Sequence, residues 1–287
     1  MKKIIFLIIF FVGLAILLYP FISQYWNSKV QSKAIADYDK IFSKLNDRDY
    51  NEMFLEAETY NRELLKLQFP LTQYKKILNY TNLLDINCNG MMGYISINKI
   101  KVEIPIYHGT GASVLNVAVG HLEGSSLPVG GKSTHSVLSA HRGLPSAKLF
   151  TDLNKLEIGD IFEITVLDRK LTYQVDKISV VEPNDVTNLK IKKNKDYMTL
   201  MTCTPYGLNT HRLLVRGVRV ENIDDKKIYV TTEAFKINSL IVAPIVASPI
   251  IFVLLLIVAF KPVNNNHNYS IDEYLKINKK FGGKNNV

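Results

Sequence analysis

Three short strings in the second half of the chain carry residue types that can together transfer an acyl group. In LSAHRGLP, an apolar run ends at His141 and a Gly/Pro turn follows. In TLMTCTPYG another apolar run ends at Cys203, and in NTHRLLV the next run opens with Arg212. Strand ends suit catalysis because a rigid scaffold supports them while the neighbouring loops shape a pocket.

Acyl transfer requires a nucleophile, a proton shuttle and a group that stabilises the oxyanion. Only the thiolate form of cysteine attacks, and a nearby cation lowers the ordinary thiol pKa of about 8.5. An imidazole, with a pKa of about 6.5, can protonate a leaving amine at neutral pH. Arginine stays charged and directs its N–H donors at an oxygen that becomes negative. A cysteine, a histidine and an arginine therefore form a coherent acyl-transfer set.

Residue types alone leave other assignments open. A cysteine in a strand is usually a small buried residue, and Cys88 lies in the turn-like stretch NCNG. Seven further residues could replace the histidine or the arginine of the set: His108, His121, His135, His211, Arg142, Arg216 and Arg219. Metal binding is not expected, because the sequence contains neither the H-E-x-x-H nor the C-x-x-C spacing. It also lacks a glycine-rich phosphate or dinucleotide loop.

Length, charge and cysteine count restrict the class of protein. The chain has 287 residues, a formal net charge of +9 and two cysteines. This length suits one ordinary domain with accessory segments, or two small domains. Two cysteines are too few for a disulfide framework. No zinc-finger, helix-turn-helix or RNA-binding signature accompanies the positive charge, so no nucleic-acid partner is expected.

Two apolar runs, residues 4–22 and 240–260, are each long enough to cross a bilayer, which takes about 20 residues. No A-x-A-like cleavage site follows the first run, which favours an uncleaved anchor over a signal peptide. Lysines lie outside both runs, at Lys2, Lys3 and Lys261. Because basic residues stay on the cytoplasmic side, both termini are predicted to be cytoplasmic and the intervening region extracellular.

The region between the apolar runs is first helical and then β-like in pattern. From residue 26 to about residue 66, apolar residues recur every three or four positions, which predicts two amphipathic helices. From residue 91 onward, short β-prone runs alternate with turn residues, which predicts a closed or nearly closed β-barrel. These runs are 93–97, 102–107, 136–140, 161–166, 171–175, 198–202 and 213–215. Residues 147–153 predict one or two helical turns.

The string TCTPYG at 202–207, followed by NTHRL at 209–213, resembles the active-site strand and loop of class C sortases. These are the pilin-polymerising sortases of Gram-positive bacteria. SAHRGLP at 139–145 resembles their histidine segment, and the strings GHLEGSSLP and IYHGT match as well. The likeness extends from about residue 93 to residue 220, and the layout with two anchors is also similar.

The resemblance implies a mainly β fold, an eight-stranded sortase-type barrel with N-terminal helices and a transmembrane helix at each end. It implies that Cys203 attacks the Thr–Gly bond of an LPXTG-like sorting signal, with His141 transferring the proton and Arg212 stabilising the oxyanion. A lysine amine of the next pilin subunit then resolves the thioester. The implied partners are pilin subunits or surface proteins with such signals, and the membrane. Neither a cofactor nor a metal is implied.

These inferences divide the chain into five predicted parts. They are an N-terminal transmembrane anchor (1–23), a helical, lid-like segment (24–90), an extracellular catalytic barrel (91–236), a C-terminal transmembrane helix (237–260) and a basic cytoplasmic tail (261–287). Two other functions remain open. One is the attachment of surface proteins to cell-wall peptide amines, and the other is a non-catalytic scaffold for pilus assembly.

The sequence departs from the class C pattern at the lid. Many class C sortases carry an Asp-Pro-Phe or Asp-Pro-Trp tripeptide that covers the cysteine, and this chain contains neither. The connection between helices and barrel reads QFPL instead. Phe69 either plugs the site from another direction or packs on the surface, and the second interpretation is preferred.

Overall fold

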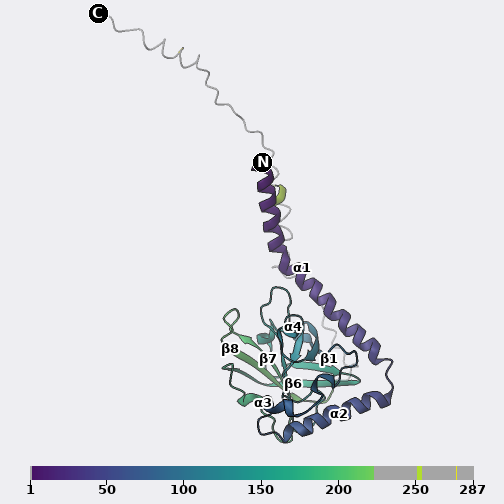
Figure 1. Ribbon diagram of the computed structural model, residues 1–287. Coiled ribbons are helices and arrows are strands. Elements are labelled where there is room, and N and C mark those ends of the chain that lie inside the picture. The colour runs from purple at the N-terminus through teal and green to yellow at the C-terminus, as the bar shows by residue number, and fades with distance from the viewer. Residues whose placement is uncertain (1, 223–250, 254–275, 277–287) are drawn as a thin grey trace, which may run out of the picture. The chain divides into compact units, whose positions relative to one another are not determined.

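The computed structural model describes residues 2–222, 251–253 and 276 (Figure 1). The chain divides into two compact units, of which Leu18–Thr232 holds the barrel. The predicted C-terminal transmembrane helix at 237–260 and the tail at 261–287 lie outside the described residues, apart from four helical positions.

Helix α1 (Lys2–Phe42) is a single helix of 41 residues, so the predicted anchor and the first amphipathic helix are continuous. By length and composition, its Leu7–Phe42 stretch could cross a membrane. Pro20 lies inside the helix, where membrane helices tolerate proline because neighbouring groups satisfy the freed carbonyl. Further along, Tyr38 is buried and its hydroxyl donates to the Met92 carbonyl oxygen (3.2 Å), which attaches the helix to the barrel.

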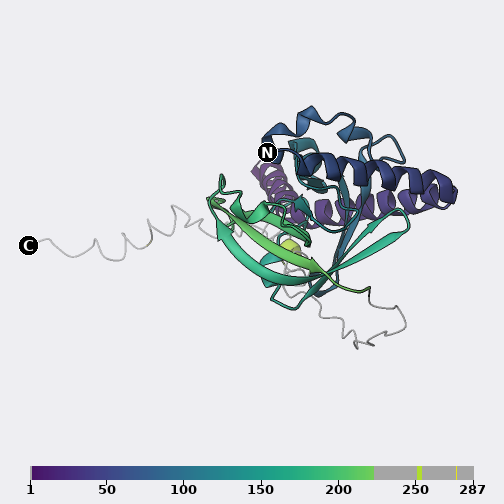
Figure 2. The same cartoon turned by 90° about the horizontal axis from the view of Figure 1, so that it is seen from below.

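Helix α2 (Asp47–Leu65) begins at a side-chain cap. The Asn46 carboxamide oxygen accepts the backbone N–H groups of Arg48 and Asp49, which would otherwise lack partners at a helix start. The apolar face of α2 buries Phe54 and Leu64 in the same core as the barrel residues. Figure 2 shows α1 and α2 on the same side of the barrel. Three short helices follow before the barrel: α3 (Pro70–Gln73), η1 (Tyr74–Lys76) and η2 (Tyr80–Asn82).

Eight strands close into a barrel in the order β1-β2-β3-β4-β7-β8-β6-β5, which confirms the predicted eight-stranded fold. The pairs β2–β3 and β4–β7 are parallel, and the other six pairs are antiparallel. The strands are β1 (Met91–Ile97), β2 (Val102–His108), β3 (Val119–His121), β4 (Thr134–Ser139), β5 (Ile161–Val166), β6 (Arg169–Val181), β7 (Asp196–Thr204) and β8 (His211–Arg219). Each of the seven predicted runs overlaps one strand. The eighth strand, β3, was not predicted, because its three residues are too few to show an alternating pattern.

The barrel interior is filled by aliphatic and aromatic side chains from every wall. Ile95, Leu200 and Val215 are completely buried there. Gly217 of β8 lets the Phe162 ring approach the backbone, since a Cβ at this position would lie 2.7 Å from a ring carbon. Such close packing fixes the strand register that positions the ends of β7 and β8.

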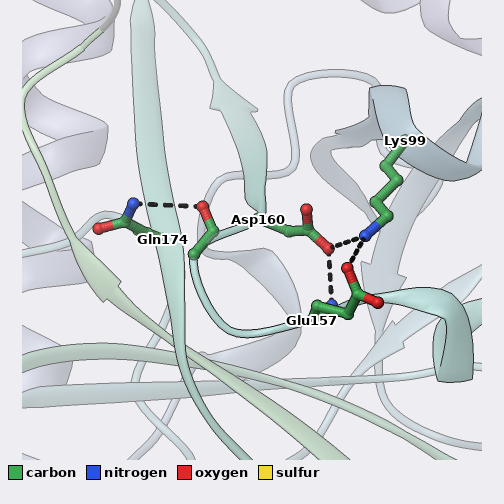
Figure 3. A network of polar contacts seen from close by, with 5 residues as sticks. Lys99, Glu157, Asp160 and Gln174 are labelled. Atoms are coloured by element: carbon green, nitrogen blue, oxygen red, sulfur yellow. Dashed lines mark hydrogen bonds and ion pairs between the residues drawn. The ribbon is translucent and has the colours of Figure 1, made fainter.

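The connection from β4 to β5 is more irregular than the sequence pattern predicts. Residues 147–153 were expected to form one or two helical turns, but the helical part is only the 3₁₀ turn η4 (Leu153–Lys155). Their apolar residues serve another purpose, because Phe150 is fully buried and closes the core from a loop. The end of this connection is held by ion pairs from Lys99 to Glu157 (2.7 Å) and Asp160 (2.8 Å), shown in Figure 3.

Candidate active site

Cys203 and Arg212 lie directly opposite each other at one end of the β7–β8 pair. They are Cα partners in this antiparallel ladder, and both side chains are half-buried. Side chains opposite each other in a ladder point to the same face, with Cβ atoms about 5 Å apart. The thiol and the guanidinium are therefore presented together, on one face of the sheet.

The position of His141 follows from the parallel pairing of β4 with β7. Ser139 is the Cα partner of Met201. The pairing continues past the strand, since the Ala140 N–H donates to the Met201 carbonyl oxygen (3.2 Å). Two residues beyond Ser139, the chain reaches His141 at the level of Cys203. If the alternation of faces continues past the end of β4 at Ser139, the His141 side chain lies on the face of Ser139 and Cys203.

Two hydrogen bonds hold the histidine segment at this level. The Thr202 hydroxyl donates to the Ala140 carbonyl oxygen (2.7 Å), and the Phe150 N–H donates to the His141 carbonyl oxygen (3.1 Å). Thr202 points to the opposite face from Cys203, so it can bind the backbone beside the histidine. Thr202 belongs to the cysteine string in the sequence, but nothing in that string indicates this role.

The Arg212 guanidinium is oriented by backbone carbonyls. Its Nη1 donates to the carbonyl oxygens of Asn209 (3.2 Å) and His211 (3.1 Å). Asn209 has a left-handed backbone (φ 57°), which turns its carbonyl toward the arginine. Within residues 2–222 no carboxylate is ion-paired with Arg212. Its positive charge is therefore available to a ligand on the same face.

Arg142, a rival of Arg212 in the sequence, joins the histidine segment to the cysteine strand. Its Nη1 donates to the Thr204 hydroxyl (3.2 Å) and its Nε to the Thr151 carbonyl oxygen (3.3 Å). Next to it, Gly143 (φ 80°) lies against the Tyr206 ring, and a Cβ on this glycine would be 2.5 Å from a ring carbon. The loops that follow β4 and β7 are therefore packed against each other.

A small apolar cluster adjoins the cysteine on its own face of the sheet. Met201 lies two residues before Cys203, and its partner Leu214 lies two residues after Arg212. Val137, Leu214 and Leu189 of the 3₁₀ turn η5 (Thr187–Leu189) are buried together here, with Met201 packed against them. An extended peptide bound near Cys203 would lie beside aliphatic side chains.

The rival histidines make structural hydrogen bonds. His121 is fully buried, with Nε2 donating to the Ser126 carbonyl oxygen (2.8 Å) and Nδ1 accepting from the Tyr80 hydroxyl (2.8 Å). His135 is also buried, and its Nε2 lies 2.7 Å from the Thr199 hydroxyl. Burial lowers the pKa of both imidazoles to about 4, which keeps them neutral at physiological pH.

The remaining rival residues have partners elsewhere. His108 contacts the Gly90 carbonyl oxygen through Nδ1 (3.0 Å), and His211 lies 3.2 Å from Glu182. Arg216 forms two bonds to the Asp176 carboxylate (2.9 and 2.7 Å), and Arg219 donates to the Thr172 carbonyl oxygen (3.1 Å). Cys88 is exposed in the turn before β1. Among the described residues, no group of three or more His, Cys, Asp or Glu could hold a metal ion.

Phe69 lies at the start of the connection from α2 to the barrel. Its side chain is 58% exposed, which agrees with the interpretation that it lies on the surface. The residues after it pack against the β3–β4 loop. A Cβ on Gly124 would lie 2.6 Å from the Leu71 Cα, so this glycine allows the close approach.

A closed eight-stranded barrel with a cysteine, a histidine and an arginine at one end is the arrangement of a β-barrel cysteine transpeptidase. The chain matches the sortase domain family over residues 95–220. The crystal structure of sortase C1 from Streptococcus agalactiae is 50% identical, with a TM-score of 0.64, covering 67% of this chain and all of that one. Streptococcus pneumoniae sortase C is 43% identical, with a TM-score of 0.58, covering 66% of this chain and 97% of that one.

A third relative, sortase D of Bacillus subtilis, is 31% identical over 131 residues. This match covers 45% of the chain and spans 63% of the Bacillus protein. The chain belongs to the sortase family, whose known members are cysteine transpeptidases. The solved structures it resembles are class C sortases.

Proposed function

We propose that the protein is a pilin-polymerising sortase. It cleaves an LPXTG-like sorting signal between Thr and Gly and joins the threonine to a lysine amine of a pilin subunit. The observation that carries this proposal is the direct pairing of Cys203 with Arg212, with His141 brought to the same level by β4. Identity of 50% over the whole of a sortase C1 structure supports it.

The three side chains can divide the reaction between them. The Cys203 thiolate attacks the threonine carbonyl carbon, and the Arg212 N–H groups stabilise the resulting oxyanion. Protonated His141 gives its proton to the glycine nitrogen, the C–N bond breaks, and a thioester remains. A lysine amine then attacks the thioester carbon, His141 takes up the proton that this amine loses, and the Cys203 thiolate leaves.

The apolar cluster beside Cys203 suits the first residues of such a signal. Met201 is partly exposed and offers aliphatic surface two residues from the nucleophile, packed on the buried Val137 and Leu214. The leucine and proline of an LPXTG-like peptide are apolar and have no charge to satisfy, and their burial gives about 25 cal/mol for each Å² removed from water. The same cluster would disfavour a charged residue at these positions.

Pilin rather than cell-wall peptide is the favoured acceptor. The class C relatives are the chain's structural neighbours, and the study of the pneumococcal sortase C concerns pilin substrate specificity. Incubation of the full-length protein with pilin subunits should give covalent ladders that grow with time. Single adducts with a cell-wall peptide amine, and no ladder, would assign the protein to surface-protein anchoring instead.

The cellular location is proposed from α1, which is long and apolar enough to anchor the protein in the membrane. If the second apolar run, 240–260, also spans the membrane, the barrel is extracellular and both termini are cytoplasmic. Exposed Cys88 provides a test in the Cys203→Ala variant, where it is the remaining cysteine. A membrane-impermeant maleimide should label this variant in intact cells. Labelling only after lysis would show that the barrel lies on the cytoplasmic side of the membrane.

The transpeptidase chemistry itself is tested by intact-protein mass spectrometry of the full-length protein with a sorting-signal peptide. The wild type and the matched Cys88→Ala variant should form an acyl adduct, Cys203→Ala should form none, and Arg212→Ala should form little. An adduct that persists in Cys203→Ala would rule out the assigned nucleophile. Pilin binding with no adduct in any variant would favour the scaffold function.

A further inference from the structure

Helix α1 contacts the loops at the Cys203 end of the barrel, and it does so immediately after its apolar run. Gln24 donates from Nε2 to the Pro145 carbonyl oxygen (3.3 Å), and Asn27 donates from Nδ2 to the Ser146 carbonyl oxygen (2.7 Å). Pro145 and Ser146 lie in the loop that follows His141. All these residues belong to the compact unit Leu18–Thr232.

The position of these contacts along α1 sets their height above a membrane. The apolar run ends at Ile22, so Gln24 lies about 3 Å beyond it at a rise of 1.5 Å per residue, and Asn27 about 8 Å. The headgroup layer on each side of a bilayer is about 5 to 8 Å thick. If the apolar run spans the hydrocarbon core, the histidine loop lies at the level of the headgroups.

The β7–β8 loop lies at the same end of the barrel and carries exposed apolar side chains. Tyr206 is 61% exposed and Leu208 is 73% exposed. The Tyr206 ring packs against Gly143, two residues before the Pro145 carbonyl that α1 binds. The β7–β8 loop is therefore within a few ångströms of the loop held by α1.

The exposed aromatic residues of α1 belong to the same level. Tyr25 and Trp26 are 66% and 70% exposed, and aromatic side chains of this kind are enriched where a membrane helix enters water. Together with Tyr206 and Leu208 they give this end of the molecule an apolar and aromatic surface. Exposed aromatic and apolar side chains at this level, on the helix and on the neighbouring loop, match the chemistry of a lipid interface.

We infer that the catalytic end of the barrel rests in the lipid headgroup layer, with Tyr206 and Leu208 as a second membrane contact beside α1. This inference rests on the proposed membrane anchoring by α1. It implies that Cys203 meets its substrates at the membrane surface. A sorting signal that is still attached to a lipid-embedded segment would therefore reach the cysteine without leaving the bilayer surface.

The test uses the full chain in lipid nanodiscs, with an environment-sensitive fluorophore on a single cysteine. Leu208→Cys and the matched control Lys132→Cys are each made in a Cys88→Ser, Cys203→Ala background. Both native side chains are exposed, but Lys132 precedes β4 and lies at the opposite end of that strand. Nitroxide lipids labelled at the headgroup should quench the Leu208→Cys probe several-fold more strongly than the Lys132→Cys probe.

Equal quenching at the two positions, or stronger quenching at the control, would overturn the inference. Quenching of the intrinsic fluorescence of Trp26, the single tryptophan of the chain, reports insertion of α1 in the same samples. If Trp26 is not quenched, the anchoring proposal fails and the inference fails with it. The adduct assay on the wild type is independent, so a failure of transpeptidation remains distinguishable from a failure of membrane placement.

Discussion

Cys203 and Arg212 are Cα partners across the β7–β8 pair, and this register gives the candidate site its form. A shift of the pairing by one residue would turn the guanidinium to the opposite face from the thiol. The register is held by the barrel core below it, where Leu200 pairs with Val215 and both are fully buried. The site therefore depends on core packing as well as on its own residues.

Replacing Arg212 with lysine is expected to slow acyl-enzyme formation by roughly 10²- to 10³-fold, the range found when an oxyanion donor is lost. Lysine keeps the charge but loses the planar fork that the Asn209 and His211 carbonyls orient. Single-turnover mass spectrometry with a sorting peptide measures the rate. The control is Arg219→Lys, at the other end of β8, whose rate should stay within a few-fold of the wild type.

Replacing His141 with alanine is expected to reduce turnover by roughly 10²- to 10⁴-fold, the usual contribution of a positioned acid or base. His211 is the informative control, because it lies next to Arg212 but contacts Glu182 and Thr210. His211→Gln should keep most of the activity. Comparable losses in the two variants would remove the assignment of His141.

The contact between Gly143 and Tyr206 can be tested with two matched glycine substitutions. Gly143 (φ 80°) and Gly159 (φ 97°) are both left-handed, so alanine at either position costs about 1–2 kcal/mol in backbone strain. A Cβ at Gly143 meets the Tyr206 ring, whereas no atom of the described residues lies within 4 Å of one at Gly159. Gly143→Ala should therefore lower transpeptidation much more than Gly159→Ala at similar thermal stability. Equal activities would show that the loop contact does not position the site.

Buried histidines should make the fold sensitive to acid. Burial lowers the pKa of His121 and His135 from 6.5 to about 4 in the folded state. Below pH 6.5 these two histidines become protonated in the unfolded chain but stay neutral in the folded protein. The contribution of these histidines to the free energy of unfolding is therefore fully present above pH 6.5. It decreases as the pH falls toward 4, by roughly 3 kcal/mol per histidine at most, and does not change further below that value.

Chemical unfolding of the detergent-solubilised protein across this pH range measures the effect. The His135→Gln variant removes one titrating group and keeps a side chain that can bind the Thr199 hydroxyl. Its stability should fall less steeply between pH 6.5 and 4 than that of the wild type. Parallel curves for the two proteins would contradict the assigned role of His135.

A closed or nearly closed barrel could be predicted because most strands have a local signal, whereas the count of eight strands came from the resemblance to class C sortases. Runs such as 161–166 alternate between apolar and polar residues and end at turn residues, and this run coincides with β5. The three residues of β3 form a strand only because β2 and β4 lie on either side. For residues 147–153 the pattern predicted helical turns that the structure does not contain. The apolar Phe150 is buried from a loop and does not form the apolar face of a helix.

The sequence by itself determined the apolar first helix and the barrel class, because these depend on run length and alternation. It supplied the candidate nucleophile through the resemblance of the cysteine string to that of class C sortases. Only the tertiary structure brought His141 to the level of Cys203, since pairing between β4 and β7 depends on contacts between distant segments. The structure also gave the rival His121, His135 and Arg216 their own partners. A local sequence pattern indicates whether a side chain will be buried. Which residue it contacts depends on how the distant strands pair when the barrel closes.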